Sequence, residues 1–143
     1  DCRELLTKEI AFGMEMCEKL VDVHVVAKGE AARTEANERM AALFDEVDFV
    51  ICATNPDTAF PAHISSNTRV GDQKVELGNN GALTIPANIS GNPAVSIPVE
   101  PFQGLPVGMQ IIGRHHEDQL LLDLARVVER TAPWALVAPG APR

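Results

Sequence analysis

Residues 104 to 113, GLPVGMQIIG, constrain the fold more than any other stretch of the chain. Apart from Gln110 the stretch is apolar, and residues 107 to 112 present apolar side chains on both faces of an extended strand. Such a strand suits a sheet that is covered by helices on both sides. Gly108 leaves room for a close neighbour, and a buried Gln110 amide needs hydrogen-bond partners. The stretch is therefore predicted to be sheet core.

Composition places the chain among globular domains and excludes two kinds of partner. The 143 residues are 45% hydrophobic and 22% charged, which fits one domain with a sizeable core. Twelve basic and twenty acidic side chains give a net charge of −8 without a Lys/Arg cluster, which disfavours nucleic-acid binding. No apolar run approaches the roughly 18 residues that a membrane span needs.

The cysteines and the N-terminus indicate the setting of the protein. Cys2, Cys17 and Cys52 are widely spaced and form no CxxC pair, so reduced thiols of a cytoplasmic protein are expected. The start, DCRELLTKEI, is charged and unlike a signal peptide. Because it lacks a methionine, we expect the chain to begin inside a longer polypeptide, although processing or truncation would leave the same start.

The pattern along the chain predicts a mixed α/β segment that occupies the whole of residues 1–143. Helical periodicity covers residues about 3–46, with a bend or break expected near Gly29. A strand is predicted at about 47–54, and the glycine- and proline-containing residues 55–82 are expected to form a long loop, as in a lid or pocket wall. Further predicted elements are strands at about 94–99 and 107–112, compatible with an antiparallel pair, a helix at about 117–131 and an irregular tail.

Two clusters invite a catalytic interpretation from their residue types. His115, His116 and Glu117 could hold a metal in a metal-dependent hydrolase. However, adjacent histidines point in different directions, whereas helical metal pairs use an i, i+4 spacing, so a solvated helix start is favoured. Ser65 and Ser66 lack the flanking glycines of a nucleophile elbow and are interpreted as an ordinary polar loop.

An ordered series of motifs connects the second half of the chain to a known family. The matching positions are Thr84, Asn88, Gly91-Asn92-Pro93-Ala94, Ser96, Pro98, Gly104-Leu105-Pro106-Val107-Gly108, Gln110, Gly113, Leu120-Leu121 and Glu129. Upstream, residues 44 to 56 contribute Phe44, Val47-Asp48-Phe49-Val50-Ile51, Thr54 and Pro56. Over residues about 23–131 the sequence resembles the C-terminal part of the amidase signature family.

The resemblance implies the C-terminal portion of a mixed β-sheet covered by helices, in an enzyme that hydrolyses linear amides without a cofactor or metal. Members use a serine nucleophile, a second serine in a cis peptide link and a lysine base. This chain has no Gly-Gly-Ser-Ser-Gly-like run, and its lysines at 8, 19, 28 and 74 lie outside the family's lysine context. The resemblance therefore implies that no catalytic residue lies in this chain and that the chain alone is inactive.

The same resemblance implies that the chain contributes part of a substrate pocket. The expected pocket residues are Asn55, Pro56, Asp57, Asn80 and Gly81. Ala53 stands where the family usually has a proline, which is a departure in the loop that follows the strand. Members that use glutamine carry a carboxylate three residues before Thr84, where this chain has Gly81. This difference favours an amide substrate less charged than glutamine.

A segment of this kind is expected to leave apolar faces uncovered, since its missing part would cover them. We therefore expect self-association or association with a complementary amidase segment, and neither a nucleic acid nor a membrane as partner. An alternative function is a stand-alone, non-catalytic binding or assembly module derived from the same fold.

Overall fold

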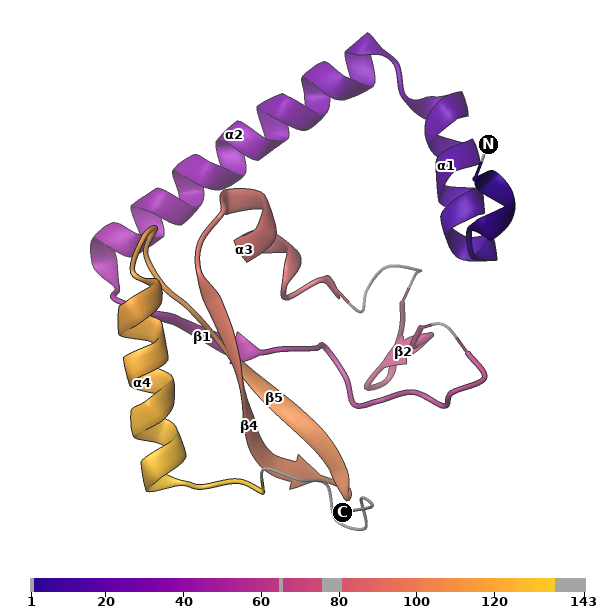
Figure 1. Cartoon of the computed structure of the whole chain (residues 1–143). Helices are drawn as coiled ribbons and strands as arrows, with labels where there is room; N and C mark the ends of the chain where they lie inside the picture. Colours follow the sequence, from indigo (N-terminus) through magenta and orange to yellow (C-terminus); the bar gives the residue numbers. More distant parts are fainter. Residues whose placement is uncertain (1, 65, 76–80, 136–143) are drawn as a thin grey trace.

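The computed structural model describes residues 2–64, 66–75 and 81–135 and has a mixed α/β architecture (Figure 1). The helices are η1 (Arg3–Leu5), α1 (Lys8–Leu20), α2 (Val23–Glu46), α3 (Ile85–Ser90) and α4 (Asp118–Thr131). The strands are β1 (Val50–Ala53), β2 (Arg69–Val70), β3 (Gln73–Lys74), β4 (Ala94–Phe102) and β5 (Leu105–Ile112). None of the helices in the described ranges combines the length and apolar character needed to cross a bilayer.

The N-terminal helical region breaks at a different place from the one the sequence predicted. The expected break at Gly29 is wrong, because α2 runs through that residue without interruption. The chain leaves the helical conformation at Val21 and Asp22 instead. The Asp22 carboxylate accepts hydrogen bonds from the backbone N–H groups of His24 and Val25 at 2.8 and 2.9 Å, which starts a new helix there. One glycine inside a long helix costs only about 1 kcal/mol, which the rest of α2 can offset.

The main sheet has three strands in the order β1-β5-β4, so β5 is central. Both of its pairings are antiparallel, with Ile111 opposite Ile51 on one side and Val95 on the other. The β4–β5 hairpin is longer than predicted, because Gln103 and Gly104 both have positive φ (52° and 77°) and form a two-residue turn. Such a turn lets the strands pair from Phe102 and Leu105 onward.

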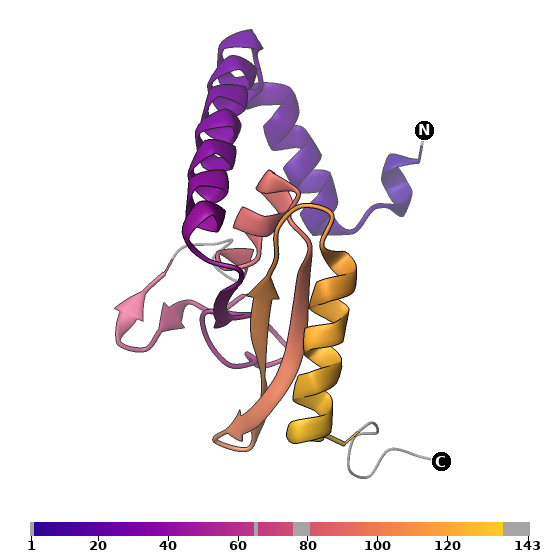
Figure 2. The ribbon, with the colours of Figure 1, turned by 90° about the vertical axis from the view of Figure 1, so that its left-hand side faces the viewer.

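Helices cover both faces of β5, as its apolar sequence predicted. On one face Ile112 packs with Phe44 of α2 and Ala87 of α3. On the other, Ile111 packs with Ile97 of β4 and Leu121 of α4. Figure 2 shows α4 along one side of the β4–β5 pair. Adjacent β5 residues thus enter two separate small cores, which explains why this strand has no polar face at its C-terminal end.

Two elements lie where the sequence predicted none. The expected loop 55–82 contains a small hairpin, in which β2 and β3 pair across a turn with Gly71 at φ 54°. Downstream, α3 is a short helix that ends at Gly91 in the left-handed conformation, φ 75°, where the Gly91 N–H donates to the Ala87 carbonyl. Both elements are too short to leave a periodic signal in the sequence.

Candidate functional site

A cavity of about 470 Å³ lies between the loop that follows β1 and the β4–β5 hairpin. The loop contributes residues 55–60 together with Asn67, and the hairpin contributes Phe102 and residues 106–108. Aromatic rings and prolines form much of the wall, and amide and carboxylate groups from Asn55, Asp57 and Asn67 add polar positions. A mainly apolar recess with a few polar groups is the usual character of a small-molecule site.

Local hydrogen bonds determine the shape of the loop wall. The Asp57 carboxylate accepts a hydrogen bond from the backbone N–H of the next residue, Thr58, at 2.7 Å. The Asn67 side-chain amide donates to the Thr58 carbonyl at 3.1 Å and fastens the loop nine residues further along. The Asn67 side chain therefore holds the wall together as well as lining it.

The predicted pocket residues do not all lie in this cavity. Asn55, Pro56 and Asp57 line it. Gly81 is not among its lining residues; the Gly81 carbonyl accepts hydrogen bonds from Thr84 just before α3, from the N–H at 3.0 Å and from the hydroxyl at 3.2 Å. Asn80 lies outside the described residues. The sequence did not identify Phe60 and Phe102 as pocket residues. Their aromatic side chains, in segments predicted to be a loop and a connection between strands, were the one indication of such a role.

A polar row crosses the sheet beside the cavity. The hydroxyls of Thr54 and Ser96 lie 2.6 Å apart over Gly108, and a Cβ atom at position 108 would come within 2.7 Å of both oxygens. Gly108 therefore makes room for two side chains, as its sequence context allowed. Two residues after Gly108 in β5, the side-chain amide of the buried Gln110 donates to the Leu83 carbonyl at 2.9 Å and to the Cys52 sulfur at 3.3 Å. Gln110 thus holds the segment before α3 against the sheet.

The hydroxyls of Ser90 and Ser96 are hydrogen-bonded to groups that are not bases. The Ser90 hydroxyl donates to the Pro86 carbonyl at 2.9 Å within α3. The Ser96 hydroxyl lies 2.6 Å from the hydroxyl of Thr54. Ser65 lies outside the described residues. A serine nucleophile needs a proton acceptor bonded to its hydroxyl, and the hydroxyls of Ser90 and Ser96 bond to a backbone carbonyl and to another hydroxyl instead.

The histidine pair supports the folded chain at the end of α3. The His115 Nε2 atom lies 2.7 Å from the Ser90 carbonyl, and His116 has a positive φ of 67° in the turn before α4. The two rings are tilted, with centroids 6.1 Å apart. Over the residues that the structure describes, no group of three or more His, Cys, Asp or Glu side chains is placed to hold a metal ion.

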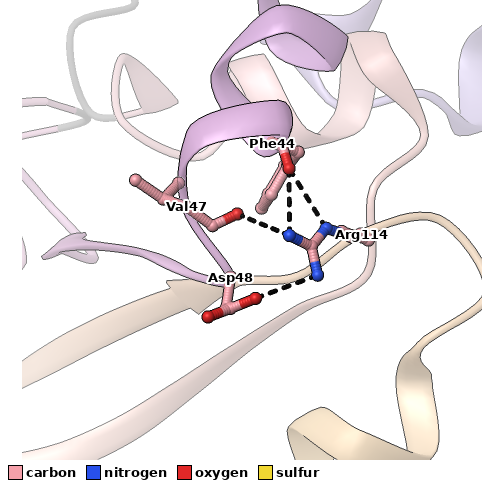
Figure 3. A network of polar contacts seen from close by, with 4 residues as sticks. All are labelled: Phe44, Val47, Asp48 and Arg114. Carbon is pink, nitrogen blue, oxygen red and sulfur yellow. Dashed lines mark hydrogen bonds and ion pairs between the residues drawn. The ribbon is translucent and has the colours of Figure 1, made fainter.

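Arg114 fixes the end of α2 to the end of β5 (Figure 3). Its guanidinium donates to the Phe44 carbonyl at 3.0 and 3.2 Å and to the Val47 carbonyl at 3.1 Å. It also forms an ion pair with Asp48 at 3.0 Å. The last carbonyls of a helix lack partners within the helix and carry partial negative charge, so an arginine is well suited to this position.

All four lysines are exposed: Lys8 and Lys19 lie on α1, Lys28 on α2 and Lys74 on β3. Lys19 forms an ion pair with Glu15 at 2.6 Å along the helix. A lysine that acts as a base is generally desolvated or placed beside another cation. None of these four is buried.

Together, a helix-covered antiparallel sheet and a cavity beside its hairpin characterise this chain of mixed helices and strands. A family model described as Amidase matches residues 2–122. The chain belongs to the amidase signature family.

Individual relatives agree with this membership. A Glutamyl-tRNA(Gln) amidotransferase subunit from Picosynechococcus is 37% identical over 108 residues, covering 75% of this chain and 21% of the relative. The solved Glutamyl-tRNA(Gln) amidotransferase subunit from Thermotoga maritima superposes with a TM-score of 0.66 at 28% identity, over 89% of this chain and 27% of that chain. A bacterial aryl acylamidase has the same fold, with a TM-score of 0.76 at 22% identity, over 90% of this chain and 27% of that chain. The chain spans about a fifth of the length of the curated relatives it matches.

Proposed function

We propose that this chain is the C-terminal segment of an enzyme that hydrolyses the C–N bond of linear amides. In this proposal the chain supplies sheet scaffold and part of the substrate pocket. The serine nucleophile, the second serine in its cis peptide link and the lysine base belong to the remainder of the enzyme. The observation that carries the proposal is the match of residues 2–122 to the amidase family by a chain only about a fifth as long as its curated relatives.

The surroundings of the serines and lysines support the proposal that the catalytic residues belong to the rest of the enzyme. The hydroxyls of Ser90 and Ser96 bond to a carbonyl and to another hydroxyl, and neither of these groups is a base. The lysines are solvent-exposed on α1, α2 and β3. Acyl transfer by a serine needs the hydroxyl, a base and aimed N–H donors in one place. Since this chain offers no such set among its described residues, we place the chemistry on the rest of the enzyme.

The cavity supports a role in substrate binding. Phe60, Phe102 and the prolines at 56 and 106 would contact an apolar substituent of the amide, and Asn55 and Asp57 would give it orientation. Asn80 and Gly81 stay proposed pocket residues of the whole enzyme on the ground of the family resemblance, and Gly81 does not line the present cavity. The absence of a carboxylate at Gly81 favours an uncharged amide over glutamine, although the relatives of this chain include Glutamyl-tRNA(Gln) amidotransferase subunits.

We place the enzyme in the cytoplasm, because Cys2 and Cys17 are exposed free thiols and Cys52 is a half-buried one. Relatives include one component of an amidotransferase and a protein solved in a vestigial complex. Assembly with a complementary segment is therefore part of the proposal.

The test is an amide-hydrolysis assay on aryl and alkyl amides. The isolated chain is expected to give no turnover above buffer, and a longer polypeptide that includes the upstream part of the same gene is expected to be active. In that longer protein, Phe60→Ala should raise KM for an aryl amide, while Phe12→Ala on the distant α1 should not. Turnover by the short chain that disappears in Ser65→Ala or Ser66→Ala would overturn the proposal. An inactive longer protein would favour the non-catalytic assembly module.

A further inference from the structure

The cavity beside the β4–β5 hairpin contains one carboxylate and no basic side chain on its described wall. Asp57 is the ionisable residue of that wall; the other lining residues are amides, a threonine, small or apolar residues, prolines and phenylalanines. No lysine, arginine or histidine of residues 2–64, 66–75 and 81–135 lines the cavity. Because an ionised carboxylate only accepts hydrogen bonds, a molecule bound here would have to supply the donor.

The hydrogen bonds of Asp57 leave one of its two oxygens for such a donor. Oδ1 accepts from the Thr58 N–H at 2.7 Å and from the Thr58 hydroxyl at 3.4 Å. Within the described residues, both of these side-chain bonds are to Oδ1. A carboxylate offers about four acceptor positions over its two oxygens, and Asp57 is exposed. The Oδ2 atom can therefore accept from a bound molecule while the contacts to Thr58 stay in place.

The walls around this carboxylate suit a flat ring. Phe60 is half-buried and Phe102 is 58% exposed, and Pro56 and Pro106 belong to the same wall. Aromatic side chains gain from a second ring that packs offset or edge-on against them, beyond the area that is buried. The cavity volume of about 470 Å³ lies within the usual range of small-molecule pockets, about 300–1,000 Å³. A ring with a polar substituent matches both the walls and the carboxylate.

An uncharged donor suits this carboxylate better than an ammonium group does. An ammonium would lose much of its hydration beside the apolar walls, and an ion pair with an exposed carboxylate returns little of that cost. A hydroxyl or N–H group has less hydration to lose, and a hydrogen bond from it to an ionised acceptor is one of the stronger kinds. The Thr58 N–H already stabilises the charge of Asp57, so no cation is required.

We propose that the amide substrate carries an aromatic ring with an uncharged hydroxyl or N–H substituent, and that Asp57 selects it. In the bound state the substituent donates to Oδ2 of Asp57, and the ring packs against Phe60 and Phe102. Asp57 is thus a specificity-determining residue and takes no part in breaking the C–N bond. This inference rests on the proposed function, because it takes the cavity to be part of an amidase pocket, and it names the class of amide.

Binding of three small ring compounds to the isotope-labelled chain tests this class without any catalysis. Benzyl alcohol brings a neutral donor, anisole has the same number of heavy atoms without a donor, and benzylammonium brings a charged donor. Titration followed by NMR should give benzyl alcohol at least about fivefold tighter binding than anisole, because only the alcohol donates to the carboxylate. The shifted amides should be those of the cavity wall, with Thr58 and Phe60 among them.

Asp57→Asn and Glu100→Gln form a matched pair, because each replaces one exposed carboxylate by the amide of the same shape. Asp57 lines the cavity, whereas Glu100 lies on β4 outside it. The asparagine oxygen can still accept from Thr58, but its NH₂ group donates where Oδ2 accepted. Asp57→Asn should therefore reduce the preference for benzyl alcohol over anisole to less than about twofold. Glu100→Gln should leave the preference unchanged.

The same substitution in the longer enzyme tests the substrate itself. The two amides are acetanilides with a hydroxymethyl or a methoxymethyl group para on the ring. Asp57→Asn should raise KM for the hydroxymethyl amide at least about fivefold and leave kcat within about twofold. For the methoxymethyl amide both constants should stay as they are. A fall in kcat with KM unchanged would contradict a role in selecting the substrate.

The remaining outcomes separate this inference from the proposed function. Equal binding of benzyl alcohol and anisole, binding outside the cavity wall, or tighter binding of benzylammonium than of benzyl alcohol would overturn the assignment. An equal loss of preference in Asp57→Asn and Glu100→Gln would overturn it as well. An active longer enzyme that is indifferent to Asp57→Asn would leave the proposed function standing without it. An inactive longer protein whose isolated chain still prefers benzyl alcohol would refute the enzyme and keep the cavity assignment.

Discussion

Thr54 and Ser96 place their hydroxyl oxygens 2.6 Å apart across the central strand, although 42 positions separate them in the sequence. Gly108 of β5 lies beneath them, and a Cβ atom there would be 2.7 Å from each oxygen. Gly108 also lines the cavity, so the hydroxyl pair lies directly against a residue of the cavity wall.

Gly108→Ala should destabilise the chain by about 1–3 kcal/mol, because the added methyl group has to displace two hydrogen-bonded side chains. The free energy of unfolding, measured by urea titration, checks this expectation. Ser96→Ala in the same background should recover part of the loss by making room for the methyl group. Equal stability of Gly108→Ala and the unchanged chain would show that the hydroxyl pair does not require a glycine.

Arg114→Met should destabilise the chain by about 1.5–3 kcal/mol, because the carbonyls of Phe44 and Val47 lose a charged donor. Asp48→Asn removes only the ion pair, whose carboxylate is 78% exposed, and should cost less than about 1 kcal/mol. Urea unfolding of the two variants separates the contributions. Because Arg114→Met also removes the ion pair, an equal loss in the two variants would assign the main role to the ion pair.

Gln110→Leu should cost about 1–3 kcal/mol, because the Leu83 carbonyl loses its recorded side-chain donor. Gln119→Leu is the matched control: this exposed glutamine bonds Asp123 on the surface of α4, and its replacement should change stability by no more than about 0.5 kcal/mol. Amide exchange at residues 83 and 84 provides a local readout, which should speed up only in Gln110→Leu. Unchanged exchange there would contradict the role of Gln110 in holding this segment.

Asp22→Ala should weaken the start of α2 by about 1 kcal/mol, since two backbone N–H groups lose their acceptor. The effect should appear as faster amide exchange at His24 and Val25, with little change near Phe44. Asp45→Ala, at the other end of the same helix, is the comparison variant and should leave exchange at the N-terminus of α2 unaltered. Faster exchange along the whole helix in both variants would indicate a loss of helix that is unrelated to the cap.

Much of the fold could be predicted from local patterns. The apolar sequence at 107–112 indicated a strand covered on both faces, and Ile111 and Ile112 do enter cores on opposite sides. The helix break lies at Asp22 and not at Gly29, because the Asp22 side chain caps a new helix, whereas one glycine inside a helix costs little. The β2–β3 hairpin and α3 escaped prediction because segments of two to six residues carry no measurable period.

The candidate site was less predictable, because its members come from distant parts of the chain. Asn55, Pro56 and Asp57 lie in the cavity wall, but Phe102 and Gly108 approach them only through the β4–β5 hairpin. The spacing of these residues in the sequence does not indicate that they lie close together in the folded chain. The resemblance groups Gly81 with the same pocket, and in this chain the Gly81 carbonyl accepts a hydrogen bond from Thr84 just before α3.

By itself, the sequence indicated the longer helices and strands, the strand that must be buried and the family that the chain resembles, because these depend on local composition and on ordered motifs. Only the tertiary structure decided the order in which the strands pair, which carbonyls Arg114 satisfies and which side chains share a cavity. Those outcomes depend on register and packing between segments tens of residues apart, where a shift of one residue would turn each side chain to the opposite face.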